Sequence, residues 1–196
     1  MEHHSFNPKE RSWMLALARW SIADAVSGLG TPEIPELEVP PKIREPRACF
    51  VTLTEDCQLR GCIGNIFANE PLFRSIIQNA QGAALRDSRF PPVQPLELDL
   101  LQVEISVLTE PRPLTFGSAE ELLALLRPGV DGVLLRIGSQ YATFLPQVWT
   151  HISIKEEFLD RLSQKAGFER SAWREANPLV SVYQAESFEE GGELTH

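Results

Sequence analysis

The spacing of apolar side chains predicts one helix and one strand hairpin in the first third of the chain. Over residues 8–26 apolar side chains recur every three or four positions, as on the buried stripe of a helix, and two glycines follow. Residues 31–46 are rich in proline and acidic side chains, which excludes a helix and predicts a connector. Residues 48–54 and 59–67 are rich in β-branched and aromatic side chains, so we expect two strands joined by a polar turn.

The middle of the chain contains the clearest strand. Within residues 98–108, apolar side chains alternate with Gln102, Glu104 and Ser106, which places the two kinds on opposite faces. Before this strand, Pro71 suits the first turn of a helix whose apolar stripe ends before the following Phe-Pro-Pro.

The last third predicts two helices and a second hairpin. Ser118 and Ser153 each precede a glutamate by three positions, the pattern of a capping box, and predict helices that run to residues 126 and 166. Gly138 and Ser139 suit a two-residue hairpin turn. Hairpins and separate helices without a βαβ repeat indicate an α+β fold with a mainly antiparallel or mixed sheet. The other elements expected are strands over 133–137, 141–145 and 179–185 and a loose polar tail over 189–196.

Charge and composition narrow the classes of function. The chain has 196 residues and a net charge of -9, which disfavours non-specific binding to nucleic acid. Three cysteines provide no disulfide framework of a secreted protein. Because we find neither the apolar run of a signal peptide nor a membrane-spanning segment, we expect a cytoplasmic protein without membrane association.

Residues 59–64, Leu-Arg-Gly-Cys-Ile-Gly, form the main candidate site. In an extended strand Arg60 and Cys62 face one side, and the glycines at 61 and 64 mark a bulge or a close approach of backbone. A thiol beside a guanidinium, with open backbone N–H groups nearby, favours the thiolate and can hold an anion. The alternative is a buried structural cysteine in a bulged strand, since most free cysteines are buried and unreactive.

Four ordered segments resemble the AMMECR family, known in bacteria and archaea as AmmeMemoRadiSam system protein A. They are LRGCIG at 59–64, RDSRFPP at 86–92, EISVL at 104–108 and ATFLPQVW at 142–149, and the match runs from about residue 12 to 188. Cys57 departs from the family pattern, because it stands in a turn where the family has a glycine. We therefore expect no functional role for Cys57.

The resemblance implies a fold more firmly than an activity. It implies one AMMECR-type α+β domain over residues 1–196, with a larger and a smaller subdomain. The family name implies Memo-like and radical-SAM proteins as partners. The family pattern carries over to Arg60, Gly61, Cys62, Ile63, Gly64, Arg89, Phe90, Pro91, Glu104, Ser106 and Gln147.

Glu104 is the second candidate for chemistry, because it interrupts an otherwise apolar strand. A carboxylate there needs a partner, which Arg60, Arg86 or Arg89 could supply. Glu104 is then either a general base or ligand anchor near Cys62, or one half of a structural salt bridge.

The remaining candidates are weaker. Gln147 follows a strand and could bind a ligand through its amide. His151 could form a thiol–imidazole pair with Cys62, but it lies outside the family motif. Cys49, Cys57 and Cys62 lack the compact spacing of a metal site, and neither dinucleotide nor P-loop glycine motifs occur, so no metal or cofactor is expected.

Three functions remain open from the sequence. The first is an enzyme or enzyme subunit that uses Cys62 with Arg60 and Glu104. The second is a non-catalytic adaptor that presents the RGCIG surface to a partner protein or to a small anionic ligand. The third is nucleic-acid binding through Arg60, Arg86 and Arg89, which the net charge disfavours.

Overall fold

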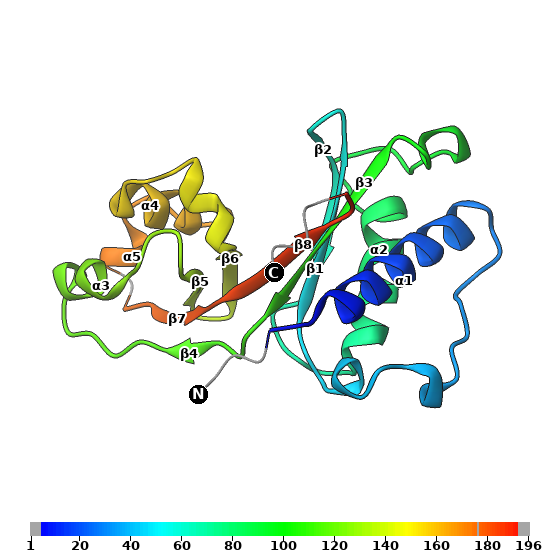
Figure 1. Cartoon of the computed structure of the whole chain (residues 1–196). Helices are drawn as coiled ribbons and strands as arrows, with labels where there is room; N and C mark the ends of the chain where they lie inside the picture. Colours follow the sequence, from blue (N-terminus) through cyan, green and yellow to red (C-terminus); the bar gives the residue numbers. More distant parts are fainter. Residues whose placement is uncertain (1–4, 176, 192–196) are drawn as a thin grey trace. The chain divides into compact units, whose positions relative to one another are not determined.

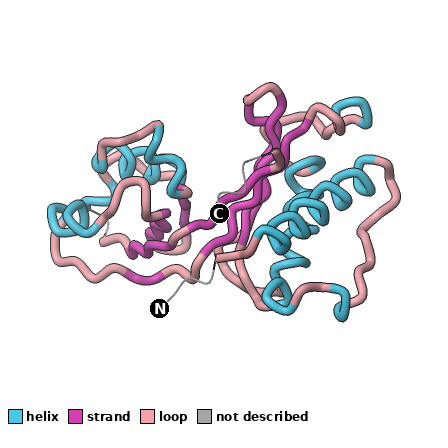
Figure 2. Tube along the Cα trace, viewed as in Figure 1, coloured by secondary structure: helices cyan, strands magenta, loops and turns pink. Residues whose placement is uncertain are grey.

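The computed structural model describes residues 5–175 and 177–191 and divides into two compact units (Figure 1). Unit 1 contains the chain up to Leu108 and again from Glu186, and unit 2 is Thr109–Ala185. Unit 2 is therefore an insertion between two strands of unit 1. Both units combine helices with an antiparallel sheet (Figure 2), so the predicted α+β class and its two subdomains are confirmed.

Unit 1 is a four-stranded sheet with two helices on one face (Figure 1). The strand order is β2-β1-β3-β8, so β2 and β8 are the edge strands. Its elements are α1 (Pro8–Val26), η1 (Glu36–Glu38), η2 (Pro41–Arg44), β1 (Cys49–Glu55), β2 (Gln58–Gly64), α2 (Leu72–Leu85), η3 (Pro95–Glu97), β3 (Leu101–Leu108) and β8 (Ala185–Glu189).

Alternation along the strands places the core of unit 1 between the sheet and the helices. Val51 and Leu53 of β1, together with Val103 and Ile105 of β3, are fully buried in one cluster with the apolar stripes of α1 and α2. Asn7 caps the start of helix α1: its side chain accepts a hydrogen bond from the backbone N–H of Glu10, and the Glu10 carboxylate accepts one from the N–H of Asn7. Among the described residues of unit 1, no helix covers the opposite face of the sheet in this way (Figure 1).

Unit 2 has its own sheet and its own core. The strand order is β4-β7-β5-β6, and the two-residue turn at Gly138 has the positive φ of 60° that the sequence predicted for a hairpin. Trp149 stacks on Phe158 with ring centroids 3.7 Å apart. The elements are β4 (Arg112–Pro113), α3 (Ala119–Leu125), β5 (Gly132–Ile137), β6 (Gln140–Phe144), η4 (Pro146–Thr150), α4 (Lys155–Lys165), α5 (Ala172–Glu175) and β7 (Leu179–Tyr183).

Two local predictions are wrong. The predicted capping box at Ser153 does not form, because α4 begins at Lys155 after Ile154, which makes no side-chain cap. The strand predicted over residues 179–185 ends too late: it is confirmed as β7, which ends at Tyr183 and pairs with β5 in unit 2, whereas Ala185 begins β8, a strand of the unit 1 sheet that was not predicted. An apolar alternation records the pleat of a strand but not the sheet in which it pairs.

The first residues of the predicted loose tail have a defined structure. β8 continues to Glu189, and the Glu190 carboxylate accepts hydrogen bonds from the Arg19 guanidinium and from the Val103 N–H. Residues 192–196 of the predicted tail lie outside the described residues. Within the described part of the chain, no helix has the length and apolar character needed to cross a membrane.

Candidate functional site

A bulge in the first hairpin decides which way Cys62 faces. Thr54 pairs with Leu59, but Leu53 pairs with Gly61, so Arg60 is the extra residue on β2. A regular ladder would instead pair Cys62 with Val51 and turn its thiol toward the helices. The bulge places the thiol on the other face of the sheet, called the open face below, where Cys62 is half-buried.

The two glycines around Cys62 are required by close contacts. A Cβ at Gly61 would lie closer than 3.0 Å to the carbonyl oxygen of Ala83 on α2, and a Cβ at Gly64 would collide with the Phe50 ring. The sequence prediction of a bulge and a close backbone approach is therefore confirmed.

Cys62 begins a polar row across three strands on the open face. Cys62 pairs with Thr52, and Thr52 pairs in turn with Glu104, so the three side chains lie side by side on β2, β1 and β3. The Thr52 hydroxyl donates to the Cys62 sulfur over 3.4 Å. Beside the row, the Ser106 hydroxyl lies 3.2 Å from a Glu104 oxygen and 2.8 Å from the Ser187 hydroxyl. Thiol and carboxylate thus share one face, as predicted.

Asp87 and Arg89 fasten the backbone of Cys62 at the free edge of β2. The Cys62 N–H donates to Asp87 Oδ2 over 2.8 Å, and Arg89 Nη2 donates to the Cys62 carbonyl over 3.3 Å. The two residues replace the hydrogen bonds of a missing neighbour strand. The predicted open N–H group at Cys62 is therefore wrong.

The same two side chains form a bidentate ion pair. Arg89 Nε and Nη2 donate to the two Asp87 oxygens over 2.9 and 2.6 Å. The Arg89 guanidinium is the main reason that the pKa of Asp87 lies well below its usual range, and the N–H groups of Cys62 and Arg89 lower it further. The pKa of Arg89 is raised chiefly by its hydrogen bond to Asp87 and to a lesser extent by the Cys62 thiol.

The predicted pairing of Arg60 with the Cys62 thiol is wrong. Its Nε and Nη2 donate to the Glu97 carboxylate over 2.7 and 3.2 Å, and Nη1 donates to the Pro91 carbonyl over 2.9 Å. Only 12% of the Arg60 side chain is exposed. All three guanidinium nitrogens are occupied, because the bulged residue points toward η3. Arg60 therefore links β2 to η3 through its hydrogen bonds to Glu97. The guanidinium that contacts Cys62 is that of Arg89, at the Cys62 carbonyl.

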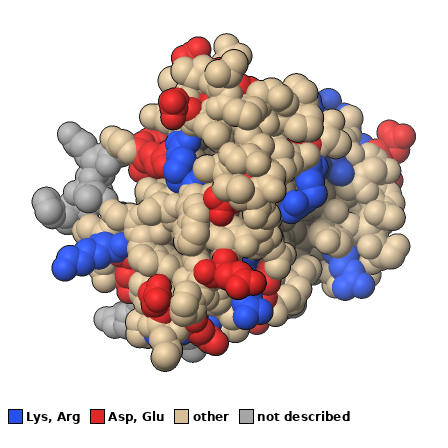
Figure 3. Space-filling view, turned by 90° about the vertical axis from the view of Figure 1, so that its right-hand side faces the viewer, with Lys and Arg blue, Asp and Glu red and all other residues tan. Residues whose placement is uncertain are grey.

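The three candidate arginines each make contacts with groups other than Glu104. Arg60 and Arg89 are paired with carboxylates of their own, and Arg86 donates to the Gln78 carbonyl over 3.0 Å. These ion pairs reduce the positive charge that a nucleic-acid site would need. On the face of the molecule in Figure 3, basic and acidic side chains are likewise interspersed.

The remaining candidates belong to other elements of the two units. Gln147 is half-buried on η4 in unit 2, and His151 is exposed at the end of the same turn. Burial raises the pKa of the Cys49 thiol to about 12, so this cysteine is unreactive, whereas Cys57 is exposed in the β1–β2 turn. Among the described residues, no three His, Cys, Asp or Glu side chains are grouped as a metal site.

Sequence reasoning missed Thr52, Asp87 and Glu97. Asp87 lies two residues before Arg89, a spacing that could have suggested a local ion pair. Thr52 could not be paired with Cys62 by counting back from the turn, because the bulge shifts the register by one. Glu97 meets Arg60 only through the tertiary fold.

Comparisons with known proteins find relatives of this chain in sequence and in fold. The family model AMMECR1 matches residues 15–188. A protein of Methanothermobacter thermautotrophicus is 37% identical over 98% of this chain and 100% of its own length. A protein of Thermococcus gammatolerans is 38% identical over 91% of this chain and 89% of its own. The crystal structure of an uncharacterized protein from Pyrococcus horikoshii has a TM-score of 0.87 and 34% identity, and covers 93% of this chain and 92% of that one.

Proposed function

This chain belongs to the AMMECR1 family, and on that premise we propose that it binds a small ligand with an anionic group on the open face of unit 1. Cys62 and the polar row contact the ligand, and Arg89 pairs with its anionic group. The observation that supports this proposal is a difference between two arginines. Arg60 donates to oxygen acceptors from all three nitrogens, whereas Arg89 donates to oxygen acceptors from Nε and Nη2.

Arg89 is suited to receive an anion. Its side chain is 55% exposed, yet Asp87 holds the guanidinium in a fixed plane. A pre-oriented guanidinium loses less freedom when it binds a second oxygen ligand. Arg89 contacts the edge strand β2 at the Cys62 carbonyl, whereas Glu104 stands two strands away from Cys62, so we place the anionic group at the Arg89 end of the row.

The test uses two alkylating reagents that differ in charge. Iodoacetate is anionic and iodoacetamide is neutral, and both react with thiols. We expect the ratio of iodoacetate to iodoacetamide rates at Cys62 to fall about threefold in Arg89→Gln, because the variant removes one nearby positive charge. Peptide mass spectrometry separates Cys62 from the exposed reference Cys57 and the buried reference Cys49.

Arg60→Gln is the matched control, since it removes the same charge from the other side of the motif. The rate ratio at Cys62 should stay within experimental error in this variant, provided that thermal unfolding shows a folded protein. An equal ratio at Cys62 in the wild type and in Arg89→Gln would refute an anion site at Arg89.

The same rates address an enzymatic use of Cys62. A nucleophilic cysteine should react with iodoacetamide faster than an ordinary exposed thiol does. Cys57 is exposed and provides that reference rate within the same molecule. If Cys62 reacts with iodoacetamide more slowly than Cys57 at every pH between 6 and 9, the thiol serves binding rather than covalent catalysis.

A second candidate function is an adaptor for the Memo-like and radical-SAM proteins that the family resemblance implies. The loop around η3 favours it: Leu96 is 92% and Leu100 59% exposed, and Arg60 fastens this loop through Glu97. Exposed large apolar side chains on a fixed loop are typical of protein-binding surfaces.

Recovery of the two partner proteins from lysate tests the adaptor. Leu96→Ser should reduce their recovery, because it removes the most exposed apolar contact. Leu179→Ser in unit 2, where Leu179 is 66% exposed, is the control and should leave recovery unchanged. Equal recovery with both variants would reject the η3 loop as the contact surface.

A further inference from the structure

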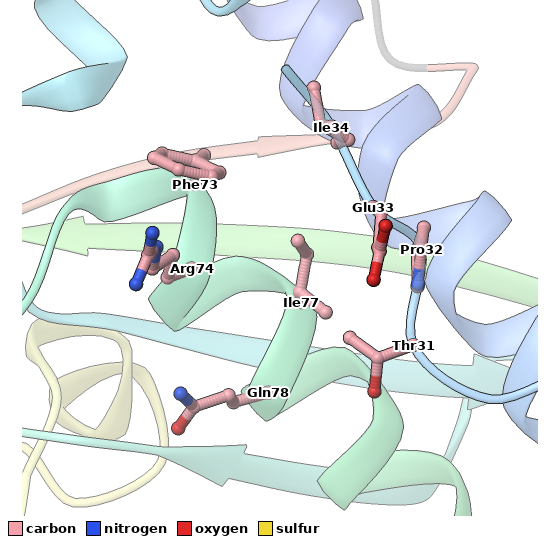
Figure 4. A pocket seen from close by; sticks show the side chains of 8 residues that line it. All are labelled: Thr31, Pro32, Glu33, Ile34, Phe73, Arg74, Ile77 and Gln78. Atoms are coloured by element: carbon pink, nitrogen blue, oxygen red, sulfur yellow. The ribbon is translucent and has the colours of Figure 1, made fainter. Parts of the chain in front are cut away.

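Unit 1 contains a pocket that is separate from the polar row. The pocket has a volume of about 410 Å³, within the range of ligand-binding clefts, and lies between the connector after α1 and the first turns of α2 (Figure 4). Phe73 and Ile77 of α2, each 5% exposed, line it together with Ile34 of the connector. The exposed side chains of Glu33 and Arg74 stand at its rim.

The connector wall is held in place from both sides. Gln81 of α2 donates from Nε2 to the Gly30 carbonyl over 3.2 Å and lies 3.4 Å from the Thr31 hydroxyl. Further along, the connector is anchored by Val39 and Ile43, which are 1% and 0% exposed. A wall fixed at both ends keeps the pocket formed without a ligand, which lowers the entropy cost of binding.

The rim has one charge of each sign. Glu33 projects from the connector and Arg74 from α2, and Ile77 lies between them in Figure 4. Among the described residues, the structure gives neither Glu33 nor Arg74 an ion-pair partner. A complementary ligand therefore has a cationic group, an apolar middle and an anionic group in that order.

The surroundings of the pocket favour a protein segment over a free metabolite. An α-amino acid has both charges on one carbon, whereas these two rim charges come from opposite walls. Leu29 and Leu37 of the connector are 76% and 89% exposed, so the apolar surface continues along the chain on both sides of the wall. An extended peptide can fill the pocket with one side chain and contact the rim with the next ones.

We propose that this pocket binds an extended segment of a partner protein in which one large apolar residue lies between a basic and an acidic residue. The apolar side chain enters between Ile34, Phe73 and Ile77. The basic neighbour pairs with Glu33, and the acidic neighbour pairs with Arg74. This inference does not depend on Cys62 or on the polar row.

Fluorescein-labelled peptides with the cores Lys-X-Glu, Lys-X-Lys and Glu-X-Glu, where X is Leu, Ile, Phe or Met, test the proposal by fluorescence anisotropy. The wild type should bind a mixed-charge core most tightly. Arg74→Glu should make the Lys-X-Lys core the best ligand, and Glu33→Lys should do the same for Glu-X-Glu. We expect each preference to change by about tenfold, since one attraction is exchanged for a repulsion. The predictions for the two variants do not depend on the direction in which a peptide lies, because the cores that they favour are symmetric.

Two controls accompany these titrations. Both substituted residues are exposed, so the variants should keep the wild-type melting temperature, and Cys62→Ser should bind the peptides as the wild type does. The proposal is overturned if no peptide of the panel binds, if the ranking of the three cores is the same in all variants, or if free leucine displaces the bound peptide completely.

Discussion

Gly61 and Cys62 are neighbours on β2, yet they face opposite sides of the sheet and meet different constraints. On the helix side there is no room for even a Cβ at Gly61, because the Ala83 carbonyl of α2 lies against it. On the open face the Cys62 thiol is half-buried and accepts a hydrogen bond from Thr52. The close packing on one side fixes the backbone, and the bulge at Arg60 then determines which side chain the other face displays.

The largest expected effect on stability comes from adding a side chain at Gly61, on the face of the sheet that packs against α2. Gly61→Ala should lower the free energy of unfolding by about 3 kcal/mol, because the new methyl group meets a backbone carbonyl that cannot rotate away. Urea denaturation followed by circular dichroism measures this loss.

Gly117→Ala is the matched control for that variant. A Cβ there would lie 3.5 Å from the nearest atom, an ordinary contact, and the residue is not among those with positive φ. We expect a change below about 0.5 kcal/mol. Similar losses in both variants would mean that the close approach of α2 does not constrain β2.

The next effect concerns the edge of β2 that carries Cys62. Asp87→Asn should lower the free energy of unfolding by about 2 kcal/mol at pH 7, because it weakens the ion pair with Arg89 at a carboxylate that is only 5% exposed. The ion pair and the N–H groups of Cys62 and Arg89 depress the pKa of Asp87. Its stabilising contribution is therefore complete above the unfolded value near 4 and is lost as the pH falls below it.

Denaturation at several pH values checks this sign. The difference between wild type and Asp87→Asn should be largest near neutral pH and shrink as the pH falls below about 4. Glu157→Gln, which breaks a pair in which Arg161 is 55% exposed, should cost at most about 0.5 kcal/mol. A constant difference between pH 3 and 7 would contradict the role of the Asp87 charge.

Much of the fold followed from local patterns. The extent of α1 was predicted correctly, because proline stands at its first position and glycines follow its last, and the alternation along β3 identified its buried face. The expected stripe of α1 was less accurate, since its Trp20 is 47% exposed. The division into β7 and β8 was not predictable in this way. The two strands follow one another with a single residue between them, and only the insertion of unit 2 into unit 1 assigns them to different sheets.

The candidate site was predictable in its residues more than in its pairing. Cys62 and Glu104 do share a face, but the expected partner Arg60 is replaced by Arg89. The reason is the bulge, which shifts the register by one residue and sends Arg60 toward Glu97. A sequence pattern indicates that glycines permit a bulge, but the tertiary contact with α2 decides where it forms.

A smaller effect, of the opposite sign, is expected at the hairpin turn. Asp56 and Cys57 have φ values of 49° and 62°, so both central residues of the turn are left-handed. Cys57→Gly should raise the free energy of unfolding by about 1 kcal/mol, because glycine adopts this conformation without strain. Cys57→Ala keeps the unfavourable φ and should be neutral. If glycine and alanine act alike, the left-handed conformation carries no measurable strain.

The smallest expected effect on stability is at Cys62 itself, and it separates the two faces most sharply. Cys62→Ser should change the free energy of unfolding by no more than about 0.5 kcal/mol, because serine preserves the contact with Thr52 and a half-buried position tolerates a small polar group. In a strain that lacks the gene, the Cys62→Ser variant should fail to restore the wild-type phenotype, whereas Cys57→Ser should restore it. A loss of 2 kcal/mol or more in the free energy of unfolding would instead mean that the Cys62 thiol is as tightly enclosed as Gly61. Only a tightly enclosed side chain responds that strongly to so small a change.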